Sequence, residues 1–150
     1  MKRSLLDAQA ADEIIARAEK LNIESSNRWG KMNVTEMLLH CNLCNTYIFE
    51  DEAVFVKPKI KERIKKFLAL HVILHFTKNN KGPKRTVTKG FIDKSNFQEQ
   101  KEKFAAIIRR FATYQKPFTS IHPAMGYLTT KEWGVVAWMH MDHHLRQFGV

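Results

Sequence analysis

Apolar residues recur at three- and four-residue steps along most of this 150-residue chain. The clearest repeat lies near the N-terminus and comprises Leu5, Ala8, Ala11, Ile14, Ile15, Ala18 and Leu21. This spacing places the apolar side chains on one face of a helix, and that face must be covered by another element. Because no unit of about 20 to 50 residues repeats, the pattern favours a helical bundle over a solenoid. The sequence therefore predicts an all-α fold, with helices over residues 5–21, 33–52, 59–76, 96–114 and 129–147.

Two of the predicted helices begin with a capping signal. Asn33 is followed three residues later by Glu36, and Thr129 is followed in the same way by Glu132. Such pairs bond reciprocally to the free N–H groups at a helix start. The connection over residues 77–95 contains the turn signal Asn-Asn-Lys-Gly-Pro and then a weakly alternating stretch. We expect either an extra short helix or a short irregular hairpin in this connection.

Composition excludes several classes of protein. Hydrophobic residues make up 44% of the chain and charged residues 27%, which does not fit a collagen-like or disordered chain. The longest apolar run, residues 67–76, contains two histidines and is too short to cross a bilayer. Asp7 precedes any apolar stretch, so no secretory signal is visible, and the closely spaced Cys41 and Cys44 do not resemble a disulfide framework. We predict one domain, residues 1–150, in a reduced cytoplasmic protein with no transmembrane segment.

Two histidines in the C-terminal pattern have the spacing of a metal-ligand pair. At about 100° per residue from Trp133, His140 and His144 fall within about 60° of the same buried stripe. Residues four apart on a helix have Cβ atoms about 5–6 Å apart, which allows two imidazoles to bind one ion. His143 falls at the edge of the stripe and is left out. Because this spacing also arises by chance, a metal site requires a further ligand from another helix.

His40 is the leading candidate for that further ligand. It lies beside the apolar seam of the second predicted helix, in a position that faces a neighbouring helix in a bundle. Three histidines from two helices, with one or more positions left open, are typical of catalytic rather than structural sites. Imidazole suits zinc, nickel, iron or copper, and the sequence does not choose among them. The seam itself comprises Val34, Met37, Cys41, Cys44 and Ile48.

Two segments of the chain resemble the DinB-like (YfiT-like) proteins. The first covers residues 29–41, with the sequence WGKMNVTEMLLHC. The second covers residues 122–149 and contains HPAMGYLT, EW and HMDHHLRQFG. The resemblance is closest to a small bacterial subgroup known only as a domain of unknown function. The family domain would fill nearly the whole chain, although residues 53–118 resemble no named family.

The resemblance implies a four-helix bundle, commonly with long crossover connections and often dimeric. It also implies a divalent metal bound by His40, His140 and His144. Relatives of this kind include transferases that use low-molecular-weight thiols such as bacillithiol or mycothiol, and a thiol-dependent isomerase. We therefore expect a metal-dependent enzyme acting on a small molecule, with a metal-activated thiol (S-transferase type) or water (hydrolase type). The alternative is a non-catalytic metal- or ligand-binding stress-response protein.

Several residues are candidates for the surroundings of the metal. Tyr47, Trp133 and Gln147 could line a cleft, and His122 could border it. Glu36, one turn before His40, could accept a hydrogen bond from a ligand. Packing or capping is the alternative role for each of them, and Glu36 is already explained by its helix cap. Other histidines and cysteines are interpreted as surface or packing residues rather than ligands, namely His71, His75, Cys41 and Cys44.

The net charge of +10 comes from one segment of the chain. Residues 57–94 contain twelve Lys and Arg and two acids, and the remaining residues contain thirteen of each sign. A solvated helix face is our first interpretation, with Phe67 on the side that faces the core. The segment could also steer an anionic small substrate, contact an anionic membrane or follow a phosphate backbone, but no nucleic-acid-binding motif accompanies it. The basic patch comprises Lys57, Lys59, Lys61, Arg63, Lys65 and Lys66.

Overall fold

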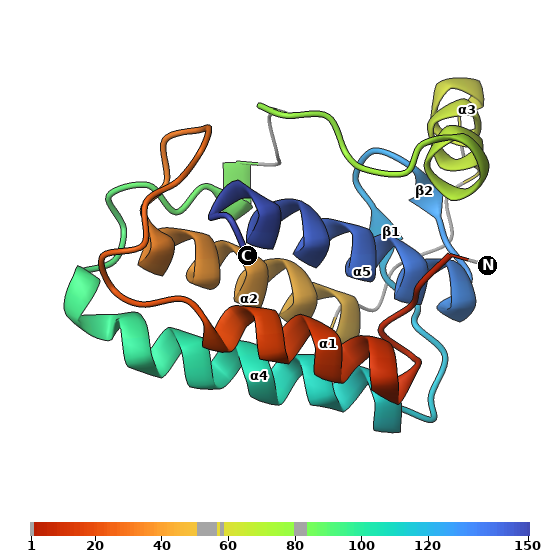
Figure 1. The fold of residues 1–150 in the computed structure, drawn as a ribbon. Helices are drawn as coiled ribbons and strands as arrows, with labels where there is room; N and C mark the ends of the chain where they lie inside the picture. Colours follow the sequence, from red (N-terminus) through yellow and green to blue (C-terminus); the bar gives the residue numbers. More distant parts are fainter. Residues whose placement is uncertain (1, 51–56, 58, 80–83) are drawn as a thin grey trace.

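The computed structural model describes residues 1–150 except 1, 51–56, 58 and 80–83 (Figure 1). Helices dominate the described residues, as the apolar periodicity predicts, and the all-α fold is confirmed. The only strands among the described residues are β1 (Ile121–His122) and β2 (Gly126–Tyr127), which form a small antiparallel hairpin. The five α-helices are α1 (Ala8–Glu19), α2 (Val34–Glu50), α3 (Ile60–Phe67), α4 (Phe97–Thr113) and α5 (Thr130–Gln147).

Four of these helices, α1, α2, α4 and α5, pack around a common core. The packed neighbours are α1 with α4, α4 with α2, α2 with α5, and α5 with α1. Helices α2 and α4 run in the same direction, whereas α5 runs opposite to α2 (Figure 1). The connection from α2 to α4 therefore crosses the length of the bundle, and it carries α3 on the way. The core includes the fully buried side chains Ile14, Leu38, Phe104, Ile108, Phe111, Met141 and Leu145.

Both predicted capping pairs are present. The Asn33 side chain accepts a hydrogen bond from the Glu36 amide at 2.9 Å, and the Glu36 carboxylate accepts one from the Asn33 amide at 2.8 Å. Thr129 and Glu132 make the same reciprocal pair at the start of α5. These bonds satisfy N–H groups that the helices cannot pair internally, so they fix where α2 and α5 begin. The prediction that the second helix extends to residue 52 falls outside the described residues.

The third helix is shorter than predicted. Instead of reaching residue 76, α3 ends at Phe67 and continues as a π-helical turn, Leu68–Val72, before Ile73 becomes extended. The Lys2 ammonium group donates hydrogen bonds to the carbonyls of Ala69 and Ile73. Carbonyls at a helix end lack internal partners, and a cation from the N-terminal segment satisfies them here. This long-range contact has no signal in the local sequence.

The described part of the connection over residues 77–95, which excludes residues 80–83, contains short helical turns and no strand. Lys84–Thr86 and Lys94–Asn96 are 3-10 turns, so of the two predicted alternatives the short helix is the one observed there. The hairpin lies instead between α4 and α5. There the His122 ring accepts hydrogen bonds from the amides of Ala124 and Met125, which closes the turn between the strands.

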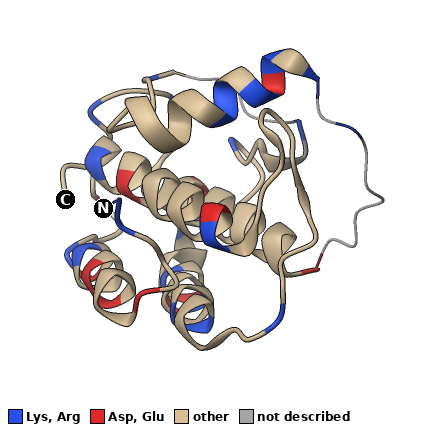
Figure 2. Ribbon diagram, turned by 90° about the vertical axis from the view of Figure 1, so that its right-hand side faces the viewer, with Lys and Arg blue, Asp and Glu red and all other residues tan. Residues whose placement is uncertain are grey.

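The basic patch lies on α3 and just before it, with Lys57 and Lys59 preceding the helix, and α3 lies outside the four packed helices (Figure 2). None of the eight described residues of α3 is buried. Ile60 is 76% exposed, Ile64 is 55% exposed and Phe67 is 59% exposed. The prediction that Phe67 faces the core is therefore wrong, because α3 meets the π-helical turn and β2 without being covered by the bundle. No described helix is long and apolar enough to span a membrane.

Candidate metal centre

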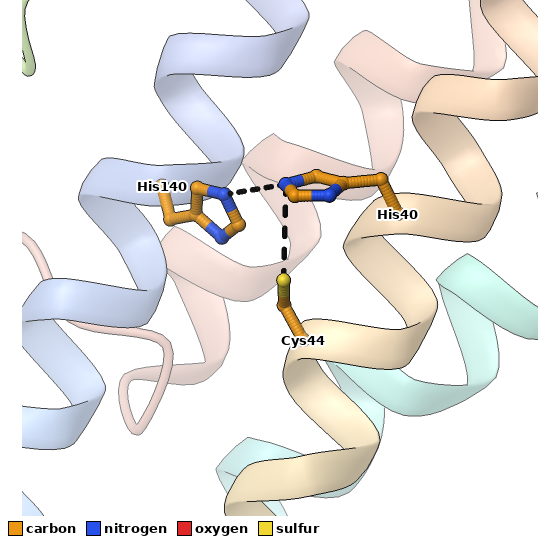
Figure 3. A group of neighbouring side chains, drawn as sticks. All are labelled: His40, Cys44 and His140. Carbon is orange, nitrogen blue, oxygen red and sulfur yellow. Dashed lines mark hydrogen bonds between the residues drawn. The ribbon is translucent and has the colours of Figure 1, made fainter. Parts of the chain in front are cut away.

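Three histidines meet where α2 packs against α5. The Nε2 atom of His140 lies 3.2 Å from Nε2 of His40 and 3.0 Å from Nε2 of His144. The ring centroids of His40 and His144 are 4.7 Å apart. We call these three residues the histidine cluster. His140 and His144 come from α5, one turn apart, and His40 comes from α2. Figure 3 shows the His40 ring directed toward His140.

Hydrogen bonds to the other ring nitrogens orient two of the imidazoles. His40 Nδ1 lies 2.7 Å from the carbonyl oxygen of Thr86. His144 Nδ1 lies 2.9 Å from Oε1 of Gln147, whose amide nitrogen donates in turn to the carbonyl of Trp29 at 2.8 Å. Because these oxygens can only accept, both Nδ1 atoms carry the proton and both Nε2 atoms present lone pairs to the centre. This arrangement is typical of histidines that bind metals.

Close packing holds Gln147 in this position. Gly30 adopts a φ of +82°, and a Cβ atom at this residue would lie 2.5 Å from the amide nitrogen of Gln147. Glycine is the residue that combines this backbone conformation with so close an approach. The loop before α2 therefore supports His144 through Gln147, although the loop itself contributes no ligand atom.

The environment of the cluster keeps its imidazoles neutral. Burial lowers the pKa of His40. Burial and the adjacent His144 and His40 lower the pKa of His140 well below its usual value. The pKa of His144 falls to about 3, chiefly because of burial and then because of His40. Neutral imidazole is the form that binds a metal, so the cluster is ready to act as a ligand set at neutral pH.

The separations of the nitrogens fit a bound transition metal. Metal–nitrogen bonds of about 2.0–2.1 Å, at angles between about 90° and 109°, place two ligand nitrogens about 2.8–3.4 Å apart. The observed separations of 3.0 and 3.2 Å lie in this range. Without a cation, His140 Nε2–H could donate to only one of the two lone pairs that face it. A cation bound beside His140 would accept the lone pairs that a single proton cannot satisfy.

Cys44, interpreted from the sequence as a packing residue, lies beside two of the three histidines, His40 and His140. Cys44 Sγ lies 3.7 Å from His40 Nε2 (Figure 3). One ligand atom from each of His40, Cys44 and His140 lies within 4.8 Å of the others, so these residues form a possible metal site. Cys41, by contrast, is fully buried and its sulfur contacts that of Met37. The signal that could have identified Cys44 is its spacing of four residues from His40.

Among the residues expected around the metal, Gln147 contacts a cluster histidine directly. Glu36 does not supply the acceptor for His40, because that acceptor is the Thr86 carbonyl. Glu36 instead accepts a hydrogen bond from the Gly90 amide at 2.6 Å, and its own carbonyl accepts one from Thr88 at 2.7 Å. It thus secures the segment that carries Thr86.

The other expected cleft residues bond to the loop that contains the hairpin. Tyr47 donates to the carbonyl of Ile121 at 3.0 Å, and the Trp133 indole donates to that of Ser120 at 3.2 Å. The His122 ring lies 5.4 Å from the Trp133 ring, and burial lowers the pKa of His122 to about 4. These contacts attach the loop to α2 and α5.

His143 lies beside the cluster, with its ring centroid 5.1 Å from that of His144. His71, His75 and the basic patch have their described contacts elsewhere. His71 and His75 are exposed, as expected, and His75 lies 3.2 Å from Asp142. Within the patch, Lys66 is half-buried and pairs with Glu132 at 2.7 Å. The other five members of the patch are exposed.

Together, the fold and the cluster define a helical-bundle protein with a possible metal centre of histidine and cysteine side chains. The chain belongs to the family described as "Protein of unknown function (DUF1569)", whose model matches residues 1–149. This agrees with the predicted resemblance to a domain of unknown function. The match also covers the middle of the chain, where the sequence pattern alone indicates no named family. Comparison with curated proteins and with solved structures found no significant match.

Proposed function

We propose that this protein binds a divalent transition metal, zinc, nickel or iron, through the Nε2 atoms of His40, His140 and His144. The observation that carries the proposal is the convergence of three Nε2 atoms at separations of 3.0 and 3.2 Å, two of them with protonated Nδ1 atoms held by carbonyl-type oxygens. The resemblance of both chain ends to DinB-like proteins supports the same three ligands. We infer membership of this wider group from the shared motifs around them.

We further propose that the metal centre serves a reaction on a small molecule. A bound divalent metal lowers the pKa of a coordinated water or thiol and so supplies a nucleophile at neutral pH. The protein would hold the imidazole ligands in the orientation and protonation state that metal binding requires. Thr86 and Gln147 hold two imidazoles in their ligand tautomers, and burial keeps the rings neutral. A low-molecular-weight thiol as co-substrate is suggested by the resemblance, as are transfer or hydrolysis as the reaction and a homodimer as the assembly.

Metal analysis tests the first part of the proposal. Protein purified without a metal-binding tag, and refilled with zinc, nickel or iron, should contain about one ion per chain. His140→Ala and His144→Ala should lose the ion while circular dichroism shows unchanged helicity. His71→Ala is the matched control, because His71 is exposed and its recorded ring contact is with Phe67. Refilled wild type without metal would contradict the proposal.

Thiol consumption tests the second part. With an electrophilic substrate, loss of free thiol should depend on the protein, stop when a chelator is added, and return with the metal. A protein that binds metal tightly but consumes no thiol and hydrolyses no ester or amide across a broad panel would favour the alternative, a non-catalytic metal- or ligand-binding stress-response protein.

A further inference from the structure

We propose that Cys44 is a fourth ligand of the same metal, so that the complete donor set is three imidazole nitrogens and one thiolate. This inference rests on the metal site proposed above and extends it. It also changes the chemistry of that site, because a thiolate would occupy a position that a three-histidine site leaves open to water or substrate.

The distance from the Cys44 sulfur to His40 Nε2 supports this role. A metal–sulfur bond of about 2.3 Å and a metal–nitrogen bond of about 2.0–2.1 Å, at a tetrahedral angle, place the two ligand atoms about 3.5–3.6 Å apart. Cys44 Sγ lies 3.7 Å from His40 Nε2. The sulfur therefore already has the separation from His40 that shared coordination requires.

The arrangement of the helices brings two matching pairs together. His40 and Cys44 are four residues apart on α2, and His140 and His144 are four residues apart on α5. Residues with this spacing project from the same side of a helix, one turn apart. Because α2 packs against α5, the two pairs come together, and one ligand atom from each of His40, Cys44 and His140 lies within 4.8 Å of the others. Figure 3 shows the Cys44 sulfur directed toward the His40 ring from the α2 side.

The surroundings of Cys41 suit a packing role, whereas those of Cys44 suit a metal ligand. Cys41 is fully buried among core residues, and burial raises the pKa of its thiol well above the usual value. Cys44 is only half-buried, and its sulfur lies 3.7 Å from His40 Nε2. When Cys44 binds the metal, its thiol proton passes to solvent and a metal–sulfur bond forms, with no change of oxidation state.

A thiolate in the donor set has consequences for selectivity and turnover. Thiolate is a soft ligand, so zinc, cobalt and iron would be favoured over harder cations such as magnesium. A substrate thiol or water would then reach the metal either as an additional ligand or by displacing Cys44. The site would resemble a closed structural site until such a molecule arrives, whereas a three-histidine site would hold water from the start.

Cobalt spectroscopy tests the inference directly. We would load wild type, Cys44→Ser and Cys41→Ser with cobalt(II) and record near-ultraviolet and visible absorption. Wild type and Cys41→Ser should show the thiolate-to-cobalt charge-transfer band, and Cys44→Ser should bind cobalt without that band. Zinc affinity in Cys44→Ser should fall by at least the roughly 10–100-fold that loss of an outer-shell partner costs.

A second measurement on the wild type covers the case in which Cys44→Ser fails to fold. Alkylation of Cys44 by iodoacetamide, mapped by mass spectrometry, should be strongly slowed by bound zinc and restored by a chelator. Cobalt bound without a charge-transfer band, together with alkylation that zinc does not change, would overturn the inference and leave the three-histidine site intact. Absence of any bound cobalt in wild type would overturn the metal site itself, and this inference with it.

Discussion

Histidines meet inside the seam between α2 and α5, whereas lysines and large apolar residues share the exterior of α3. In the seam, the histidine cluster is oriented by Thr86 and Gln147, and His144 is buried. On α3 no described residue is buried, and Ile60 and Phe67 are among the most exposed apolar side chains of the protein. The first region is organised by buried partners within the chain, whereas the Lys66–Glu132 ion pair ties α3 to the bundle only at the surface.

This difference indicates where function resides. Burying three imidazoles costs free energy unless their polar atoms find partners, so their retention together with matched acceptors points to a ligand that completes them. Exposed lysines carry no such cost and are common on helix surfaces. This contrast supports the proposed metal site between α2 and α5 and gives no comparable support for a site on α3.

The first prediction removes His140, the central residue of the histidine cluster. Zinc at about 100 times its dissociation constant should stabilise wild type by about 2.7 kcal/mol. For a chain of this size, that corresponds to a rise of roughly 5–10 °C in the midpoint of thermal unfolding. His140→Ala should abolish the rise, because His140 Nε2 faces both other ring nitrogens. His71→Ala, measured by the same calorimetric scan, should retain it, and an undiminished rise in His140→Ala would place zinc elsewhere.

The second prediction concerns the hairpin, which lies against α3 and is attached to α2 and α5. His122 has a pKa of about 4 in the folded protein, below the usual value near 6.5, because it is buried. The unfolded chain therefore binds more protons between these pH values. The free energy of unfolding should fall as pH decreases through this window, by up to about 3 kcal/mol from this residue alone.

His122→Asn separates this titration from the hydrogen bonds of the loop. An asparagine oxygen can accept from the amides two and three residues later, as the His122 ring does, but it does not titrate. Urea unfolding of the metal-free protein, measured at pH 7 and pH 4, should give a smaller pH dependence for His122→Asn than for wild type. Equal pH dependence in the two proteins would mean that other groups account for the loss of stability.

The third prediction tests whether Gln147 positions His144. Gln147→Leu should weaken zinc binding by roughly 10–100-fold, or about 1.4–2.7 kcal/mol, because the acceptor for His144 Nδ1–H is lost. Gln147→Glu keeps an acceptor and should retain zinc affinity, although it loses the donor to the Trp29 carbonyl. Competition with a chromophoric chelator measures both affinities. Equal weakening in the two variants would indicate a packing role instead.

Much of the seam could be predicted from the sequence, because its ligands follow helical periods. The four-residue spacing of His140 and His144 predicts that they share one face of a helix. The apolar stripe around Met37 and Cys41 predicts that His40 faces a neighbouring helix. Thr86 could not be found in this way, since it contributes a backbone carbonyl, which every residue possesses. Cys44 has the correct spacing from His40, but the sequence favours packing for it because two helical cysteines without a second cysteine pair are weak evidence for a zinc site.

The α3 region shows where periodicity stops being informative. An amphipathic pattern predicts that a helix has an apolar face, but it does not say what covers that face. Phe67 was expected to face the core, and it is 59% exposed because α3 lies beside the bundle rather than within it. The end of the helix depends on Lys2, some 70 residues away in the sequence. Such long-range contacts carry no local signal.

The last prediction concerns the lysines of the basic patch. Lys59, Lys61 and Lys65 are exposed, so replacing all three with glutamine should change the free energy of unfolding by no more than about 0.5 kcal/mol per substitution. Zinc affinity should stay at the wild-type value, because screening in physiological salt limits the reach of surface charges to about 8 Å. If the patch steers an anionic substrate, the association rate alone should fall, and the loss should disappear at high salt. Salt-dependent retention of wild type on immobilised DNA, lost in the triple variant, would instead assign α3 a nucleic-acid-binding role independent of the metal.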